Sequence, residues 1–391
     1  MQCAVSVSNH SDPQYAAQTV SHSVHQELGK QECHLACCFF SAHFLNDLEK
    51  IVDVIQASLH PRTLLGCLGD GVIGGHHEFE DQPALILWGL SQPGLRAFPL
   101  RLTPNFSQDP PLLEGWPDEL TGEGGGVSCL MFADPLTTPI HELLARFEQA
   151  GEGLQVIGGF AGSGGETEGH RLILNDAVVD AGVVGVVIQS GAQVRAVVSQ
   201  GCRPIGERYV VTRADRNVLY ELGGSSPIER LESTIQALPS VARKQALLGV
   251  QVGIAMDEYR ADFAQGDFLI RGLLGANRMD GSLVVGDFLQ EGQTIQFHIR
   301  DNVAASDDLN RLLVKEQQAV PHRDPQGGLL FSCNGRGQRF FATDHHDISA
   351  VHERFGPIPV AGFFAGGEFG PVGGKNFLHG YTASLALFYD T

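Results

Sequence analysis

The chain lacks the long apolar runs of membrane proteins and has few basic residues for its size. No segment reaches the ~18 uninterrupted apolar residues of a transmembrane helix, and the opening MQCAVSVSNHSDPQ lacks the basic flank and apolar stretch of an export signal. Lysine and arginine number 26 against 45 aspartate and glutamate residues, which gives a net charge of −19. This charge repels phosphate backbones, and no Lys/Arg cluster offsets it. We therefore expect a soluble, cytoplasmic protein that binds neither membranes nor nucleic acid.

Familiar catalytic signatures are also missing. The segment GPVGGKN, which ends at Asn376, lacks the glycine spacing and the hydroxyl residue of a phosphate-binding loop. No HExxH, SxxK, nucleophile elbow or dinucleotide-binding GxGxxG is found. These absences argue against a common hydrolase, kinase or dehydrogenase, and we expect no cofactor.

The cysteines predict neither disulfides nor a metal site. Eight cysteines are spread over a large chain without an export signal, which favours free thiols. Cys33, His34, Cys37 and Cys38 crowd together in ECHLACCFF, but ACCFF is typical of a buried strand in which cysteine acts as a small hydrophobe. The DHHD segment from Asp344 to Asp347 is interpreted as a solvated loop.

Length and composition predict two domains with many turns. At 391 residues the chain exceeds the ~250 to 300 at which one core stops growing. Its 48 glycines are well above the usual ~7 % and indicate many tight strand-to-loop junctions. Residues 1–35, rich in Ser, His and Gln, are predicted to be a disordered tail, followed by domains over 36–235 and 236–391. Strands and helices mix in both halves, so the fold class is α+β: two lobes of β-rich mixed sheets with helices packed outside.

A short pattern indicates an internal duplication. An aliphatic residue, any residue, Gly, four of any residue and Gly occurs at Leu64–Gly71, Ile157–Gly164 and Val360–Gly367. Each copy falls at the end of an apolar run that predicts a strand. In a glycine-rich chain chance matches are expected, so the evidence for a duplication is mainly that each match lies at a predicted strand end.

The C-terminal part holds the strongest candidate site. Two apolar strands, in GGLLFSCNGRG and PVAGFFAGGEFGP, each end in a glycine-rich turn that carries a polar group. Arg336 offers a bidentate fork for a carboxylate, and Glu368 could face an amino group. Glycines let the backbone approach a small molecule closely. The candidate ligand-binding residues are Cys333, Asn334, Gly335, Arg336, Gly337, Phe363, Gly366, Gly367, Glu368, His379 and Thr382, with Asp70, Gly71, Cys202 and Arg203 on similar turns of the first half.

Several of these residues have a structural interpretation as well. Cys333 either lines a pocket or ends the core strand LLFSC, and Arg336 either binds a ligand or forms an internal salt bridge, for instance with Glu368. His379 is more often a structural group than a functional one. Phe363 and Phe364 alternate faces, so one belongs to the core and the other to a pocket wall.

These motifs resemble a known family. FSCNGRG followed by IPVAGFFAGGEFGP and LHGYTASL resembles the FIST C-terminal domain, and LLGCLGDGVIG, VIGGFAGSG and VSQGCRPIGERYVVTRADRNVLYELGG resemble the FIST N-terminal domain. The similarity runs from about residue 36 to residue 391. It implies a sensory module that binds small ligands, proposed to be amino acids or their derivatives, in signal transduction.

Three functional classes are compatible with these residues. The first is a stand-alone ligand-binding sensor that meets a separate signalling partner, with a homo-oligomer left open. The second is an enzyme with Cys333 as nucleophile and His345 or His379 as base. The third is a protein-interaction adaptor without a small ligand, and no residue is assigned as catalytic.

Overall fold

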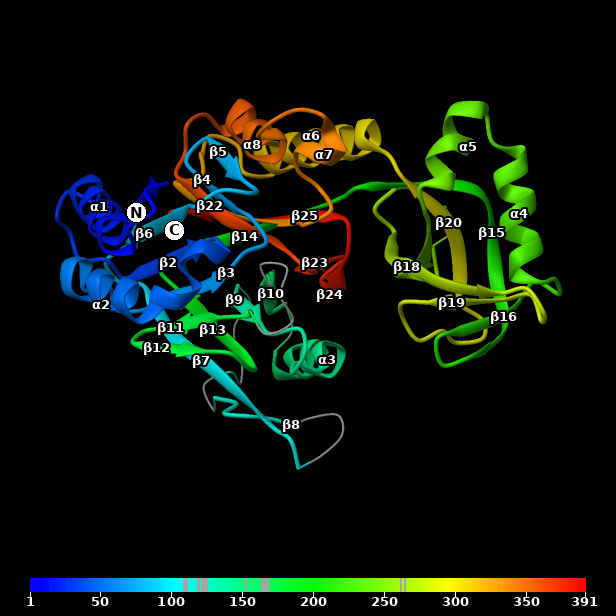
Figure 1. Cartoon of the computed structure of the whole chain (residues 1–391), viewed down its shortest axis with the longest axis horizontal. Coiled ribbons are helices and arrows are strands. Elements are labelled where there is room, and N and C mark those ends of the chain that lie inside the picture. The colour runs from blue at the N-terminus through cyan, green and yellow to red at the C-terminus, as the bar shows by residue number, and fades with distance from the viewer. Residues whose placement is uncertain are drawn as a thin grey trace. The chain divides into compact units, whose positions relative to one another are not determined.

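The chain divides into two compact units (Figure 1). The computed structural model describes residues 1–107, 112–117, 120, 126–151, 153–162, 169–260, 262–263 and 265–391. The first unit comprises Met1–Val198, Asn310–Leu378 and Thr382–Thr391, and the second comprises Ser199–Leu309 and His379–Tyr381. The predicted α+β class with mixed sheets is confirmed. The domain boundary between residues 235 and 236 stays a prediction.

The first unit is built on three mixed sheets. In spatial order, the first contains β1 (Gln2–Ser8), β6 (Leu85–Ser91), β2 (Leu35–Phe40), β3 (Leu64–Leu68), β11 (Leu172–Leu174) and β12 (Ala177–Val179). The second contains β24 (Lys375–His379), β23 (Glu368–Val372), β10 (Gln155–Phe160), β9 (Ser128–Ala133), β13 (Val183–Ser190), β7 (Arg96–Asn105) and β8 (Leu112–Glu114). The third contains β14 (Gln193–Gln200), β25 (Thr382–Tyr389), β21 (Gly327–Cys333), β22 (Val360–Ala365), β4 (Val72–Gly74) and β5 (His77–Phe79).

These sheets repeat one plan three times. Each has a parallel pair at its centre, β2–β3, β9–β10 or β21–β22. A helix connects the strands of each pair: α2 (Leu48–Leu59), α3 (Ile140–Ala150) or α8 (His346–Phe355). After each pair comes a hairpin, and then a strand that returns antiparallel to the first strand of the pair. The repetition predicted from the glycine pattern therefore extends to three copies.

The copies exchange their hairpins in a ring. Hairpin β4–β5 of the first copy pairs with β22 of the third, β11–β12 of the second pairs with β3 of the first, and β23–β24 of the third pairs with β10 of the second. Each sheet is thus completed by another copy. The predicted repeat at Ile157–Gly164 reaches Gly164, which lies outside the described residues.

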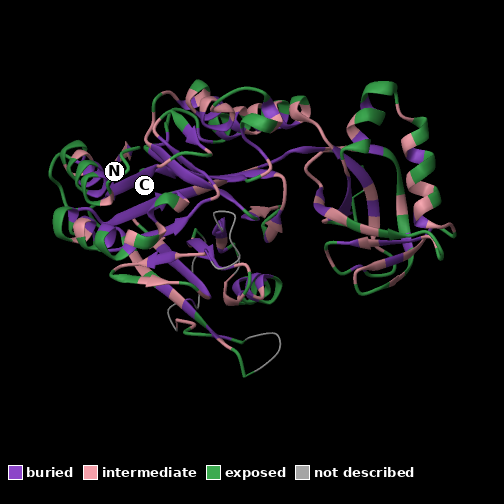
Figure 2. Cartoon of the chain, viewed as in Figure 1, coloured by how far each residue is buried: buried purple, intermediate pink, exposed green. Residues whose placement is uncertain are grey.

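A cluster of equivalent phenylalanines fills the centre of the first unit. Phe39, Phe132 and Phe331 occupy the same place on β2, β9 and β21, and their ring centroids are 5.5 to 6.4 Å apart. Phe363 joins them, with its ring centroid 5.4 to 5.5 Å from each. Such edge-to-face pairs contribute beyond simple burial. The inner faces of the three sheets therefore share one aromatic core. Figure 2 shows that the strands of the first unit are largely buried.

Helices cover the outer faces, as the sequence predicts. The apolar side of α2 packs on the even-numbered residues of β2, while the odd-numbered ones face the aromatic core. The apolar stripe of α3 packs in the same way on β9. Helix α6 (Asn302–Ala319) meets β14 through the Arg195–Glu316 ion pair, and the short α7 (Gln338–Phe341) precedes α8. The 3-10 helix Ala42–Asp47 leads into α2.

The prediction that residues 1–35 form a disordered tail is wrong for most of them. Strand β1 pairs with β6 along its whole length, and Pro13–Glu27 forms helix α1. Asp12 caps this helix by accepting a hydrogen bond of 2.7 Å from the Tyr15 amide. The helix buries a narrow stripe of small residues, namely Ala16, Ala17, Val20, Ser21 and Val24. The Ser, His and Gln residues between them conceal that stripe in the sequence.

The second unit is a closed six-stranded barrel. In spatial order its strands are β15 (Cys202–Asp215), β16 (Val218–Leu222), β19 (Ser282–Val285), β18 (Phe268–Asn277), β17 (Val250–Ala255) and β20 (Thr294–Arg300). Helices α4 (Pro227–Ala237) and α5 (Ser240–Leu247) contribute to its apolar core. Among the described strands of this unit, closure of the barrel leaves no unpaired edge. The barrel lies between β14 and most of α6 in the sequence, so it is an insertion into the third copy.

Candidate functional site

A ring of backbone hydrogen bonds joins the three copies where their second strands end. We call residues 68–71, 160–162 and 364–367 the glycine collar. The bonds at its three equivalent turns are Asp70 N to Phe364 O at 3.1 Å, Gly162 N to Leu68 O at 2.8 Å and Gly366 N to Phe160 O at 3.4 Å. A second set closes the ring: Phe364 N to Gly71 O, Phe160 N to Gly367 O and Leu68 N to Arg171 O.

Close packing within the collar explains why some of its positions are glycine, without any need for unusual backbone angles. A Cβ on Gly71 would lie 2.8 Å from the Phe364 ring, and one on Gly162 would lie 2.3 Å from the Asp70 amide. A Cβ on Gly366 would meet nothing within 4 Å, so the collar has open space beside this residue. Neither Gly366 nor Gly367 lies in the left-handed region.

The turn after β21 joins this collar. The Asn334 amide nitrogen donates to Ala365 O at 2.9 Å, and its side-chain Nδ2 donates to Asp70 Oδ2 at 2.8 Å. The Gly335 amide donates to the Cys333 sulfur at 3.5 Å. Gly337 adopts φ of 78°, which a residue with a side chain rarely does. The predicted residues Asp70, Cys333 and Asn334 are therefore brought together.

Arg336 is buried in an ion pair with Asp347. Its Nε and Nη2 donate to the two carboxylate oxygens at 2.7 and 2.8 Å, and both side chains are at most 2 % exposed. The predicted pairing with Glu368 is therefore replaced by another partner. Asp347 lies in the DHHD segment, so the interpretation of this whole segment as a solvated loop is wrong.

The carboxylate of Asp347 is held by further donors. Ser332 Oγ donates to Oδ2 at 2.6 Å, and His346 Nδ1 lies 2.9 Å from Oδ1. Burial raises the pKa of Asp347, but the Arg336 charge and the hydrogen bonds from Arg336, His346 and Ser332 outweigh it and hold the pKa well below its usual range. Phe341 stacks on His346 at 3.4 Å and lies 5.0 Å from the Arg336 guanidinium. Asp347 and Phe341 thus hold the Arg336 guanidinium between them.

Glu368 is fully buried at the start of β23. Its Oε2 accepts hydrogen bonds from the Thr382 amide at 3.2 Å and the Thr382 hydroxyl at 2.7 Å. Burial raises its pKa to about 8, although contacts with Thr382, Arg336 and Cys333 favour the charged form. Among the described residues, neither Glu368 Oε1 nor Arg336 Nη1 has a hydrogen-bond partner. Two buried polar atoms near Cys333 therefore have unused hydrogen-bonding capacity, which is uncommon in a folded protein.

Other predicted residues have structural roles. Phe363 belongs to the aromatic core and is fully buried, so its assignment as a ligand-binding residue is corrected: the alternation of faces directs it inward. Cys202, Arg203 and His379 belong to the second unit. Arg203 pairs with Asp301 at 2.6 Å, and Cys202 is buried at the start of β15. His345 Nδ1 accepts a hydrogen bond from the Glu78 amide at 3.0 Å.

The sequence reasoning missed Ser332, Asp347 and Glu78. Glu78 lies on β5 and accepts hydrogen bonds from the first turn of α8. A signal for Asp347 was present in the sequence, because a buried arginine needs a carboxylate and DHHD lies shortly after Arg336. No local pattern pointed to Glu78, since its partners come from a different copy.

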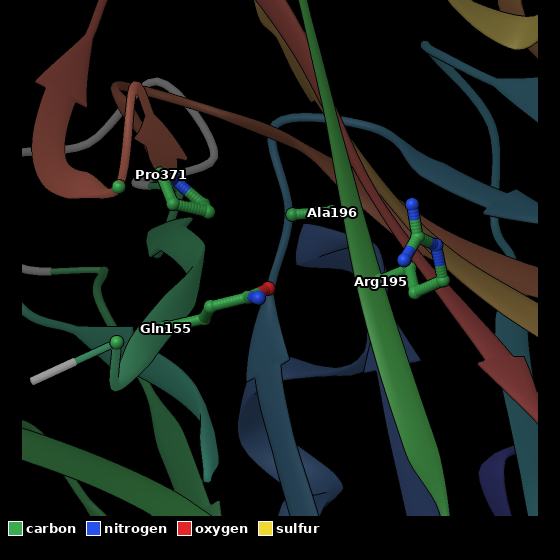
Figure 3. A pocket seen from close by; sticks show the side chains of 6 residues that line it. Gln155, Arg195, Ala196 and Pro371 are labelled. Atoms are coloured by element: carbon green, nitrogen blue, oxygen red, sulfur yellow. The ribbon is translucent and has the colours of Figure 1, made fainter. Parts of the chain in front are cut away.

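A cavity lies elsewhere in the first unit. It measures about 260 Å³ and is lined by Gly153, Gln155, Arg195, Ala196, Pro371 and Gly374, none of which was predicted. Figure 3 shows the Gln155 side chain extending from β10 toward the strand that carries Ala196. Arg195 is already paired with Glu316. This lining offers few free polar groups for ligand recognition.

The described residues contain neither a metal cluster nor a membrane helix. No group of three or more His, Cys, Asp or Glu side chains among them could hold a metal ion. No helix in the described ranges is long and apolar enough to cross a membrane.

The fold defines the class of this protein: three βαβ units that exchange hairpins in a ring, with a β-barrel inserted into the third unit. The family model of the FIST N domain matches residues 34–225, and that of the FIST C domain matches residues 228–371. The chain therefore belongs to the FIST family, whose domains are associated with small-ligand binding in sensory and signal-transduction proteins.

Relatives match along the whole chain. An uncharacterized protein of Mycobacterium tuberculosis strain H37Rv is 40 % identical over 390 residues, which cover 100 % of both chains. An uncharacterized protein of Mycobacterium bovis is 37 % identical over 390 residues, covering 100 % of this chain and 99 % of the relative.

Proposed function

We propose that this protein is a cytoplasmic small-ligand sensor whose ligand is an amino acid or a related carboxylate. The ligand binds where the glycine collar meets the turn after β21, and a separate signalling partner responds to the bound state. The observation that carries this proposal is the pair of buried, unpartnered atoms, Arg336 Nη1 and Glu368 Oε1. Leaving such atoms unpaired costs about 1 to 3 kcal/mol each, so a ligand that satisfies both gains that energy on binding.

The protonation of Glu368 decides which ligand group fits. A pKa of about 8 keeps this carboxyl mostly neutral at pH 7. Because Oε2 accepts two hydrogen bonds from Thr382, the proton belongs on Oε1. Oε1–H and Nη1–H are then two donors on neighbouring, electrostatically coupled side chains, a combination that suits a carboxylate. Glu368 therefore faces the ligand's acid group rather than its amino group.

The collar also supplies a group for the ligand's ammonium. Asp70 lies on the collar and is linked by Asn334 to the turn that carries Arg336. The equivalent positions in the other two copies are Gly162 and Gly366, so Asp70 is the one carboxylate at these three positions. We assign Asp70 to the ammonium group of a zwitterion.

A binding screen with matched derivatives tests this assignment. The twenty amino acids are compared by thermal shift and calorimetry with their carboxamides and their N-acetyl forms, at pH 6.5 and pH 9. We expect carboxamides to fail, and the parent's affinity to fall as Glu368 ionises, by up to about tenfold per pH unit above 8.

Variants of Glu368 separate its charge from its size. Glu368→Gln keeps a donor at this position, so it should bind and lose the pH dependence, whereas Glu368→Ala should not bind. Glu316→Gln, a buried glutamate paired with Arg195, is the matched control and should bind like the parent. Equal binding of carboxamides would contradict the carboxylate site, and a flat screen would favour an adaptor without a small ligand.

A further inference from the structure

The segment that carries Arg336 receives several hydrogen-bond acceptors from the first copy. Asp70, Glu78 and Glu80 all lie between β3 and the residue after β5, and each accepts hydrogen bonds from residues 334–348. The contacts are Asn334 Nδ2 to Asp70 at 2.8 Å, Gln338 N to Glu80 at 2.8 Å, and Asp347 N and Ile348 N to Glu78 at 3.0 and 3.1 Å. His76 and His352 add a contact of 2.9 Å between their Nδ1 atoms.

Glu78 has the central place in this arrangement. Its Oε1 accepts both amide hydrogen bonds from the first turn of α8, where a carboxylate also stabilises the helix dipole. Its own amide donates to His345, the residue that caps α8. Its Oε2 has no hydrogen-bond partner among the described residues, and the side chain is only 5 % exposed.

We propose that Glu78 is a positioning residue for the ligand site: by fixing the first turn of α8 it sets the place of Asp347, and through Asp347 the place of Arg336. This inference rests on the proposed function, because Arg336 is the ligand-binding group. The connection is short, since Glu78 bonds the Asp347 amide while the Asp347 carboxylate bonds Arg336.

The surroundings of Glu78 make this positioning dependent on pH. Asp347 and Glu80 face its carboxyl, with His345 on its backbone side. Burial, followed by the Asp347 and Glu80 charges, raises its pKa to about 8 against the opposing amide hydrogen bonds. Below that pH Glu78 is neutral and is not repelled by the Asp347 carboxylate, although the two amide hydrogen bonds by themselves favour the ionised form. Above it, two ionised carboxylates lie side by side, and the first turn of α8 should open more often.

Hydrogen–deuterium exchange of the ligand-free protein tests this step without any ligand. Peptides covering residues 343–352 are followed between pH 7 and pH 9, with rates corrected for intrinsic exchange. In the parent, protection of the Asp347 and Ile348 amides should fall about tenfold across this range. Glu78→Ala should remove that protection at both pH values, and Glu78→Gln should keep it and flatten the pH dependence. Glu353→Gln, on the same helix, should behave like the parent.

The amino-acid screen is then repeated with the same variants. Loss of binding in Glu78→Ala with rescue in Glu78→Gln supports the positioning role. Unchanged protection in Glu78→Ala would overturn it, as would a parent-like pH dependence in Glu78→Gln. Altered protection in a protein that binds nothing in the screen would support the role of Glu78 in fixing α8 and would count against the proposed ligand.

Discussion

Two arginine–aspartate pairs show how burial changes the meaning of the same contact. Arg336–Asp347 in the first unit is at most 2 % exposed, whereas Arg203–Asp301 in the barrel unit is 31 % and 13 % exposed. Both have hydrogen bonds below 2.8 Å. If the barrel pair separates, water can hydrogen-bond its charged groups. Water does not reach the buried pair, so the surrounding protein must supply every further donor to Asp347. Ser332 and His346 do so for Asp347.

Truncating one partner of each pair should give the largest contrast. Arg336→Ala leaves Asp347 buried without its counter-charge, and we expect it to destabilise the fold by about 3 to 5 kcal/mol. Arg203→Ala should cost about 1 kcal/mol or less, because water reaches its partner. Urea unfolding at pH 7 measures both. Similar losses would mean that burial does not separate the two pairs.

The second largest difference between the units should be in the pH dependence of stability, which we expect a buried glutamate of the first unit to influence. The pKa of Glu368 is raised from 4.5 to about 8 on folding, so the folded state holds its proton more tightly than the unfolded chain. The contribution is fully present below pH 4.5 and falls by about 1.4 kcal/mol per pH unit until the pH passes about 8. Glu368→Gln should remove this fall.

The control for this experiment is the exposed Glu207 of the barrel unit. Glu207→Gln should leave the curve of unfolding free energy against pH unchanged between pH 5 and pH 9. Parallel curves for the parent and Glu368→Gln would show that Glu368 is ionised in the folded protein at neutral pH.

A side-chain bridge should give the smallest difference. Asn334→Ala removes the hydrogen bond to Asp70, and we expect a loss of about 1 kcal/mol. Thr212→Ala in the barrel unit removes an exposed hydrogen bond to Glu221 and should change stability by less than about 0.5 kcal/mol. Thermal unfolding of both variants makes the comparison. Equal shifts would indicate that the hydrogen bond from Asn334 to Asp70 contributes no more than an exposed one.

The sequence predicts the repeated strands better than the exchange of hairpins between the copies. The glycine pattern located all three second strands, because a glycine is needed where each strand lies against its parallel neighbour. The structure places Gly66, Gly158 and Gly362 at that position, each with its Cβ site within 2.4 Å of a carbonyl oxygen of the neighbouring strand. The pattern had matched Gly159, one residue further on. The exchange of hairpins depends on long-range pairing, which no local pattern encodes.

The candidate site was predicted only in part, because local patterns reveal some of its residues and long-range folding brings in the others. Cys333, Arg336 and Glu368 stand out locally because each interrupts a glycine-rich turn, and the structure brings them together. Asp347 and Glu78 become partners of this site only through folding. Phe363 was misassigned because an alternating strand tells which residues share a face, but not which face is the core.

The exchanged hairpins also set the order in which this protein can mature during synthesis. Val72 of the first copy pairs with Phe363 of the third, so the edge of β4 that faces away from β5 has no partner until nearly the whole chain has left the ribosome. The β10 edge likewise waits for β23. Early copies must therefore persist with open strand edges, a state that favours slow folding and association with other chains. A nascent or truncated FIST chain should depend on chaperones for longer than a protein of equal length whose domains close one after another.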